Sequence, residues 1–178
     1  TRAKLKPEVL DIDLYRYTDS QVSAFLQKNR FDIIGLGNII SGYKFTKRLC
    51  QLVNQSQPET LLVVGNTVVS IPQKVMAWIP EIDVAVLGEG DETIVELVRA
   101  VEGKVPLGAV AGIVYQEGGQ LRTTQARPVI TEMSAIPFPD FSLFEVERYV
   151  EESTPMVPST PLMPKKRLTT LPLNSARG

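Results

Sequence analysis

Three glycine-containing segments have the residue types and the spacing of a ligand-binding edge. They cover residues 37–42, 65–70 and 88–93, and each follows an apolar run that is typical of a β-strand. In open α/β sheets, ligands bind at the carboxyl ends of the strands. Glycine lets a ligand approach the backbone closely, and a following helix directs free N–H groups toward phosphate or amide oxygens. The three segments together predict a site for such a ligand along one sheet edge.

Short polar side chains in these segments could hydrogen-bond to the ligand. The candidates are Asn66, Thr67, Ser70 and Thr93. The same residue types are ordinary turn and capping residues, and for any single segment that structural role is the better explanation. Ser70, for example, is expected to cap a short helix that contains Pro72 in its first turn. The recurrence of such residues in three segments favours ligand binding.

Catalytic chemistry is limited by the residues that the chain lacks. It has no histidine and one cysteine, Cys50, which we expect to pack in a helix. These counts exclude the usual kind of zinc site, a histidine-based triad and an internal disulfide. The acidic residues Glu89, Asp91 and Glu92 are expected to stabilise the positive end of the next helix, not to bind a metal. We therefore expect no catalysis from this chain by itself, and any cofactor must be held by backbone amides, hydroxyls, carboxylates and packing.

The composition is that of an ordinary folded domain. Of 178 residues, 43% are hydrophobic and 22% are charged, with a net charge of −1. This balance gives no electrostatic footprint for nucleic acid. No apolar run approaches the roughly 20 residues that cross a bilayer, and the N-terminus has no signal-peptide core. We expect a cytoplasmic protein that binds neither nucleic acid nor membrane.

Strand and helix patterns alternate along the first hundred residues. Thr18 and Gln21 form a capping box at the start of one helix, and Gly103 ends another. Continuous apolar strands separated by helices are typical of a parallel sheet covered on both faces. The predicted fold is therefore α/β, a Rossmann-like (flavodoxin-like) three-layer arrangement. The predicted strands cover residues 9–14, 31–36, 61–64 and 83–87, and the helices carry apolar stripes at 22–26, 45–53 and 94–101.

The pattern changes after residue 104. Residues 111–115 and 120–124 flank Gly118 and Gly119, which predicts a β-hairpin. Five prolines among the last 28 residues predict an irregular linker. The predicted domains are a Rossmann-like cofactor-binding domain at 1–104, a hairpin and bridge at 105–150, and a Pro-rich linker at 151–178.

The first predicted strand has no central strand and helix before it, although a doubly wound sheet normally starts with them. We expect the chain to begin at what is usually the second strand, which would leave a gap in the sheet. A partner chain or the first ten residues would fill this gap, and a homodimer is one such arrangement.

Several segments resemble the cobalamin-binding domains of radical S-adenosylmethionine (SAM) enzymes. Residues 62–72 (LVVGNTVVSIP) resemble the family segment VVGG-x-H-x-S-x-x-P. Residues 83–93 (DVAVLGEGDET) resemble D-x-V-x-x-GEGE-x-T, and the hairpin resembles GI-x-Y-x-x-x-G. Residues 136–141 (IPFPDF) resemble the bridge to the catalytic barrel. The terminal Arg177 and Gly178 resemble the end of the triplet that precedes the cluster-binding cysteines, so we expect a chain cut just before them.

The resemblance implies a cobalamin-binding module that acts with its own C-terminal radical SAM barrel. That barrel would carry the iron–sulfur cluster and S-adenosylmethionine, and the parent enzyme would be a methyltransferase or an oxidative cyclase. The implied cofactor contacts hold the nucleotide tail of cobalamin and perform no chemistry. They are Gly65, Asn66, Thr67, Ser70, Gly88, Glu89, Gly90 and Thr93.

Two departures from the family pattern leave alternatives open. Asn66 stands where the family has its second glycine, and Val68 stands where it frequently has histidine. Cobalt could therefore take no imidazole from this chain. One alternative is a degenerate domain that has lost the cofactor and acts as an interaction or substrate-covering module. Another is a general nucleotide-binding domain.

Overall fold

The computed structural model describes residues 5, 7–132, 134 and 136–152, which form two compact units. The first, the sheet unit, comprises residues 17–136. The second, the terminal unit, joins the described residues of 5–16 to residues 137–152. The first two residues of the predicted Pro-rich linker at 151–178 are helical, at the end of α6 (Val146–Glu152), and the rest of it, with the terminal motif, lies outside the described residues.

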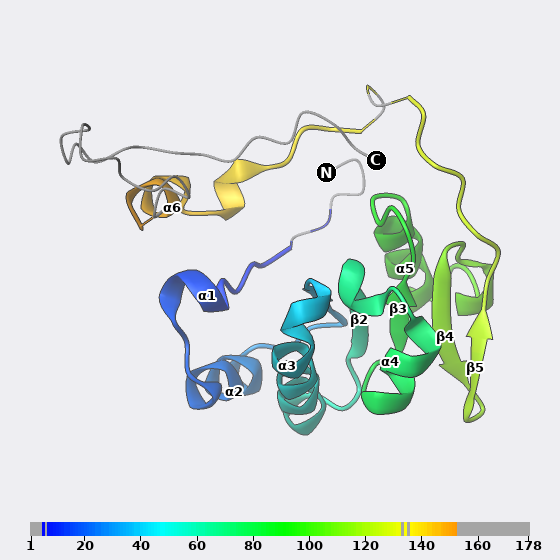
Figure 1. The fold of residues 1–178 in the computed structure, drawn as a ribbon, viewed down its shortest axis with the longest axis horizontal. Coiled ribbons are helices and arrows are strands. Elements are labelled where there is room, and N and C mark those ends of the chain that lie inside the picture. The colour runs from blue at the N-terminus through cyan, green and yellow to red at the C-terminus, as the bar shows by residue number, and fades with distance from the viewer. Residues whose placement is uncertain (1–4, 6, 133, 135, 153–178) are drawn as a thin grey trace. The chain divides into compact units, whose positions relative to one another are not determined.

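The sheet unit is built on five strands in the order β1-β2-β3-β4-β5 (Figure 1). Strands β1 to β3 are parallel, β4 pairs antiparallel with β3, and β5 pairs antiparallel with β4. The predicted hairpin therefore forms, and it extends the same sheet. The strands are β1 (Ile33–Gly37), β2 (Leu61–Gly65), β3 (Val84–Val86), β4 (Ile113–Glu117) and β5 (Gln120–Thr123).

Four helices lie between or before these strands: α2 (Asp19–Lys28), α3 (Tyr43–Ser56), α4 (Pro72–Trp78) and α5 (Thr93–Val101). The connections through α3 and α4 step in the same direction across the sheet, so right-handed crossovers place both helices on one face. The predicted capping box of α2 is confirmed, because Thr18 and Gln21 satisfy each other's backbone N–H groups. Within the described residues, no helix has the length and apolar character needed to cross a membrane.

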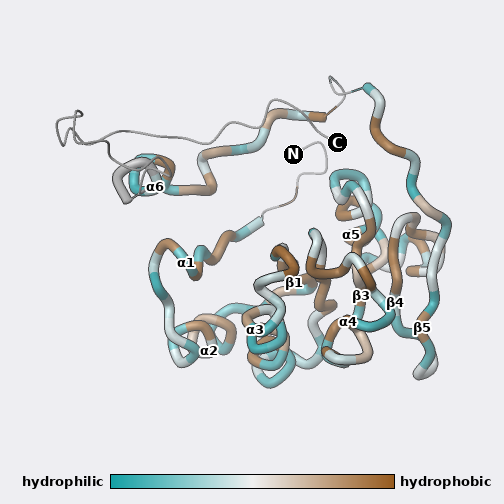
Figure 2. The backbone as a smooth tube through the Cα atoms, in the orientation of Figure 1, coloured by the Kyte–Doolittle hydropathy of each residue, from teal (hydrophilic) through white to brown (hydrophobic). Residues whose placement is uncertain are grey.

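The α5 helix covers the opposite face of the sheet. Its Leu97 is completely buried in a cluster with Val63, Val84 and Ile113. Side chains alternate between the faces of a strand, so the buried Leu62, next to Val63, points toward the α3 side. Figure 2 shows hydrophobic residues concentrated in the central strands and hydrophilic residues along α3. The predicted α/β three-layer arrangement is confirmed.

The predicted first strand at residues 9–14 is wrong. This stretch forms a one-turn helix, α1 (Ile12–Tyr15), in the terminal unit. The Asp11 carboxylate accepts a hydrogen bond from the Leu14 amide at 2.9 Å and so caps the turn. A strand needs a neighbouring strand for its backbone hydrogen bonds, and among the described residues none pairs with this stretch. Local capping satisfies the backbone instead.

Strand β1 has a partner on one side only among the described strands. The Asp32 carbonyl accepts the Leu61 amide at 3.1 Å. Because backbone groups alternate along a strand, those of Ile33, Gly35 and Gly37 point away from β2, toward the free edge. Both glycines are exposed, and no atom lies within 4 Å of a Cβ built on either.

Candidate functional site

The loops after β1, β2 and β3 leave the same edge of the sheet, because these strands are parallel neighbours. Two hydrogen bonds join the first loop to the second. The Ile40 amide donates to Thr67 Oγ1 at 3.2 Å, and the Val68 amide donates to the Asn38 carbonyl at 3.1 Å. The first two of these loops therefore lie at one edge, as predicted, and contact each other directly.

The loop after β2 turns at Asn66, which has φ 68° and ψ −171°. This backbone conformation is otherwise almost restricted to glycine. The Asn66 Oδ1 atom accepts a hydrogen bond from the Thr67 amide at 2.6 Å, which stabilises the turn locally. The backbone thus keeps a glycine-type conformation although the side chain is present.

Ser70 does not cap α4, contrary to the prediction. Its hydroxyl donates to the Thr67 carbonyl at 2.6 Å, and Ile71 occupies the N-cap position without a side-chain hydrogen bond. The intervening turn of 3₁₀ helix, η2 (Thr67–Val69), places Ser70 one residue too early for capping. Asn66, Thr67 and Ser70 are all exposed, so this loop presents an amide and two hydroxyls at the sheet edge.

The segment that follows β5 forms hydrogen bonds with the loop after β3 and with the start of α5. Gly88 has φ 68°, and the Gly90 carbonyl accepts the Ile94 amide at 2.9 Å as α5 begins. Thr93 is completely buried, and its hydroxyl oxygen accepts a hydrogen bond from Arg127 Nε at 3.0 Å. The Glu89 carboxylate accepts the Ile130 amide at 2.7 Å. The Glu89 and Thr93 side chains therefore bind the segment after β5.

Arg127 is the centre of this arrangement, which we call the Arg127 clasp. Its side chain is 9% exposed and pairs with Glu92 at 2.8 Å and with Glu96 at 2.5 Å. Burial disfavours the guanidinium charge, but the hydrogen bonds and charges of Glu96 and Glu92 outweigh it and raise the Arg127 pKa above its usual value. The clasp fixes the start of α5 to residues that follow the hairpin.

Apolar side chains are also exposed at the same edge. Ile39 and Ile40 after β1 are 56% and 59% exposed, and Ile71 after β2 is 51% exposed. Sequence reasoning missed these three residues because an apolar residue beside a strand is expected to be buried. With the polar groups of Asn66 and Thr67, they make an edge that suits a large ligand with both apolar and amide-bearing surfaces. Within the described residues, no three His, Cys, Asp or Glu side chains are grouped to hold a metal ion.

Comparison with known families shows which family the chain belongs to. The model of a family described as the B12 binding domain matches residues 3–98. The chain belongs to the B12-binding domain family. Among curated relatives, an uncharacterized methyltransferase of Pyrococcus horikoshii is 28% identical over 139 residues, covering 78% of this chain and 30% of that protein. The anaerobic magnesium-protoporphyrin IX monomethyl ester cyclase of Rubrivivax gelatinosus is 30% identical over 139 residues, with coverages of 75% and 25%.

Solved structures show the same fold. The radical S-adenosylmethionine methyltransferase TsrM from Kitasatospora setae superposes with a TM-score of 0.63 at 12% identity, over 70% of this chain and 25% of that one. The cobalamin-dependent S-adenosylmethionine radical enzyme OxsB, with aqua-cobalamin and S-adenosylmethionine bound, gives 0.56 at 24% identity, over 67% and 17%. The B12-binding chain thus spans less than a third of the length of these relatives.

Proposed function

We propose that this chain is the cobalamin-binding module of a larger radical SAM enzyme, whose activity is methyl transfer or oxidative cyclisation. The observation that carries the proposal is the shared edge of the first two loops, where the Ile40 amide bonds to Thr67. In the proposal, the parent's own barrel carries the iron–sulfur cluster and S-adenosylmethionine. Cobalamin supplies a cobalt centre for alkyl-transfer or one-electron chemistry when it is bound.

The residues of this edge fit the cofactor. Exposed Ile39, Ile40 and Ile71 suit the apolar rim of a corrin, and the exposed Asn66 and Thr67 suit its amides. In the proposal, Ser70 and the backbone at Gly65, Gly88 and Gly90 contact the nucleotide tail. Glu89 and Thr93 support the loop and do not contact the cofactor, because their side chains already bind Ile130 and Arg127.

The alternative is a degenerate module that covers substrate or binds a partner without cofactor. Two observations favour it. Val68 is completely buried, so the position that frequently holds histidine in the family lies in the core here. The side-chain oxygen Oδ1 of Asn66 already accepts a hydrogen bond from the Thr67 amide.

The test is retention of hydroxocobalamin by the purified chain through gel filtration, followed by its visible spectrum. Near one corrinoid per chain supports the proposal. Thr67→Val removes the side-chain acceptor of one of the two hydrogen bonds that join the loops, so we expect about tenfold weaker binding for this charge-neutral change. Thr123→Val, in the exposed strand β5, is the matched control. An intact parent enzyme that stays active without any corrinoid would contradict the proposal and leave the degenerate module.

A further inference from the structure

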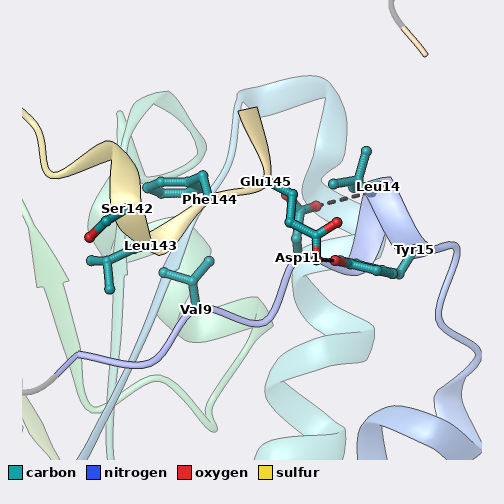
Figure 3. A pocket seen from close by; sticks show the side chains of 8 residues that line it. All are labelled: Val9, Asp11, Leu14, Tyr15, Ser142, Leu143, Phe144 and Glu145. Atoms are coloured by element: carbon teal, nitrogen blue, oxygen red, sulfur yellow. Dashed lines mark hydrogen bonds between the residues drawn. The ribbon is translucent and has the colours of Figure 1, made fainter. Parts of the chain in front are cut away.

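The terminal unit contains a groove of about 300 Å³ (Figure 3). Its apolar lining comes from both stretches of the unit, with Val9 and Leu14 from one and Leu143 and Phe144 from the other. Asp11 and Glu145 add carboxylates to the same lining. The groove therefore combines an apolar surface with negative charge.

The two sides of the groove are tied together by specific contacts. The Tyr15 hydroxyl donates to the Glu145 carboxylate, and the Tyr149 hydroxyl donates to Asp11. The Arg148 guanidinium lies 4.3 Å from the centre of the Tyr15 ring. These contacts join residues more than a hundred positions apart, so the groove is a built feature of the unit.

Much of the apolar surface around the groove remains uncovered. Phe144 is 43% exposed, Leu143 is 39% exposed and Phe141, in the neighbouring turn, is 57% exposed. Single exposed apolar residues are ordinary, but a contiguous group beside a groove marks an interaction site.

A segment with matching chemistry follows directly in the sequence. After α6 (Val146–Glu152), prolines recur at every third position, at 155, 158, 161 and 164. A polyproline II helix has three residues per turn, so this spacing puts all four prolines along one edge. Such segments bind in grooves lined by aromatic and apolar residues, because the bound form is already populated before binding.

The charges also match. The proline repeat is followed at once by Lys165, Lys166 and Arg167, whereas the groove carries Asp11 and Glu145. Complementary charges of this kind fix the direction in which a segment binds. Two residues separate the repeat from the end of α6, and so short a link gives a millimolar effective concentration at the groove.

We propose that residues 155–164 bind in this groove as a polyproline II segment of the same chain, with the basic run beside the groove carboxylates. The groove is thereby an intramolecular docking site. It holds the chain that leaves the module close to α6, and it does so independently of cofactor binding.

Hydrogen exchange in the full chain tests this proposal. The variant Pro158→Ala with Pro161→Ala should speed amide exchange about tenfold in peptides covering residues 5–16 and 139–152. This is the ratio of a millimolar effective concentration to an affinity of about 0.1 mM. Peptides of the sheet unit should not change, and Pro172→Ala, outside the repeat, is the matched control. Equal exchange in the parent, the double variant and the control would overturn the proposal. Protection that depends on protein concentration would also overturn it, because a second copy would then occupy the groove.

A variant of the groove itself gives an independent measurement. Leu143→Asn changes a partly exposed side chain and leaves the tyrosine–carboxylate contacts in place. Docking of the repeat should slow trypsin cleavage after Lys165, so Leu143→Asn should raise the cleavage rate several-fold, as the double proline variant does. Unchanged cleavage in both variants would contradict docking.

Discussion

Arg127 Nη2 lies 2.5 Å from Glu96 Oε2, which joins the segment after the hairpin to the first turn of α5. The contact lies at the start of α5, directly after the glycine loop that follows β3. It also brings Glu92 and the buried Thr93 into one hydrogen-bonded group. The candidate edge is therefore supported by residues that lie far outside the glycine loops in sequence.

The Arg127 clasp should contribute measurably to stability. Arg127→Met removes the charged hydrogen bonds to Glu96, Glu92 and Thr93, and we expect the free energy of unfolding to fall by about 2 kcal/mol, as for other partly buried charged hydrogen bonds. Urea denaturation followed by circular dichroism measures this change. Arg122→Met is the matched control, because Arg122 pairs with Glu117 at 3.6 Å and both side chains are more than half exposed. That change should cost less than about 0.5 kcal/mol, and equal losses in the two variants would show that the clasp has no special role.

The chain with Asn66 should be less stable than a variant with glycine at this position. Its conformation, φ 68° and ψ −171°, carries a backbone strain of about 1 kcal/mol or more for any residue with a Cβ. We expect Asn66→Gly to raise the free energy of unfolding by about 0.5–1 kcal/mol, since the loss of strain exceeds the added chain entropy and the loss of the hydrogen bond to the Thr67 amide. Asn66→Ala should lower it, because alanine keeps the Cβ and loses the hydrogen bond to the Thr67 amide. Thermal unfolding of both variants gives the comparison, and a more stable alanine variant would contradict the strain.

Asp83 should make stability depend on pH in the direction opposite to most carboxylates. Burial raises its pKa above the ordinary value of 3.8, although the Leu62 amide, which donates to the carboxylate at 2.8 Å, acts against this. The folded chain therefore holds this proton more tightly than the unfolded chain does. Its contribution to stability is largest below the unfolded pKa and declines as pH rises through the folded one.

Asp83→Asn should remove this dependence, because an amide keeps an acceptor for the Leu62 N–H group and carries no charge. The stability difference between variant and parent should shift in favour of the variant as pH rises from about 4 to 7, in urea titrations at several pH values. Asp13→Asn, at an exposed carboxylate, serves as the control. A difference that is constant with pH would contradict the buried-carboxylate explanation.

Cys50 should be unreactive in the folded chain. It is completely buried, and burial raises its pKa to about 12. At pH 8 only about one thiol in ten thousand would be ionised, and thiolate is the reactive form. Reaction with an aromatic disulfide reagent should therefore wait for unfolding, whereas a thiol introduced as Gln120→Cys in the exposed β5 should react at once. Rapid labelling of Cys50 in native conditions would show that α3 opens readily.

The sequence was informative where local patterns govern structure. The capping box at Thr18 and the apolar strands around Val63 and Val84 depend on nearby residues, and both were predicted. The stretch at 9–14 was misassigned because a strand exists only with a neighbour to pair with, and Asp11 offered a local alternative. Ser70 was misplaced because one turn of 3₁₀ helix shifted the start of α4.

The residues that support the site left no signal in the sequence. Arg127 meets Glu96 across 31 positions, and no periodicity or spacing rule links two such residues. For the exposed Ile39 and Ile71 the sequence gives a misleading signal, because an isoleucine beside a strand predicts burial. Three-dimensional proximity was needed to show that both kinds of residue belong to the candidate edge.

Among the strands that the structure describes, β1 has no partner on one side, which bears on how copies of this chain meet at high concentration. Ile33, Gly35 and Gly37 point their backbone groups outward, and the strand carries neither lysine nor proline to discourage pairing. An extended segment of a neighbouring molecule would continue the hydrogen-bond ladder through these groups. We therefore expect a lysine at Gly35, where a Cβ meets open space, to reduce pairing between copies at high concentration.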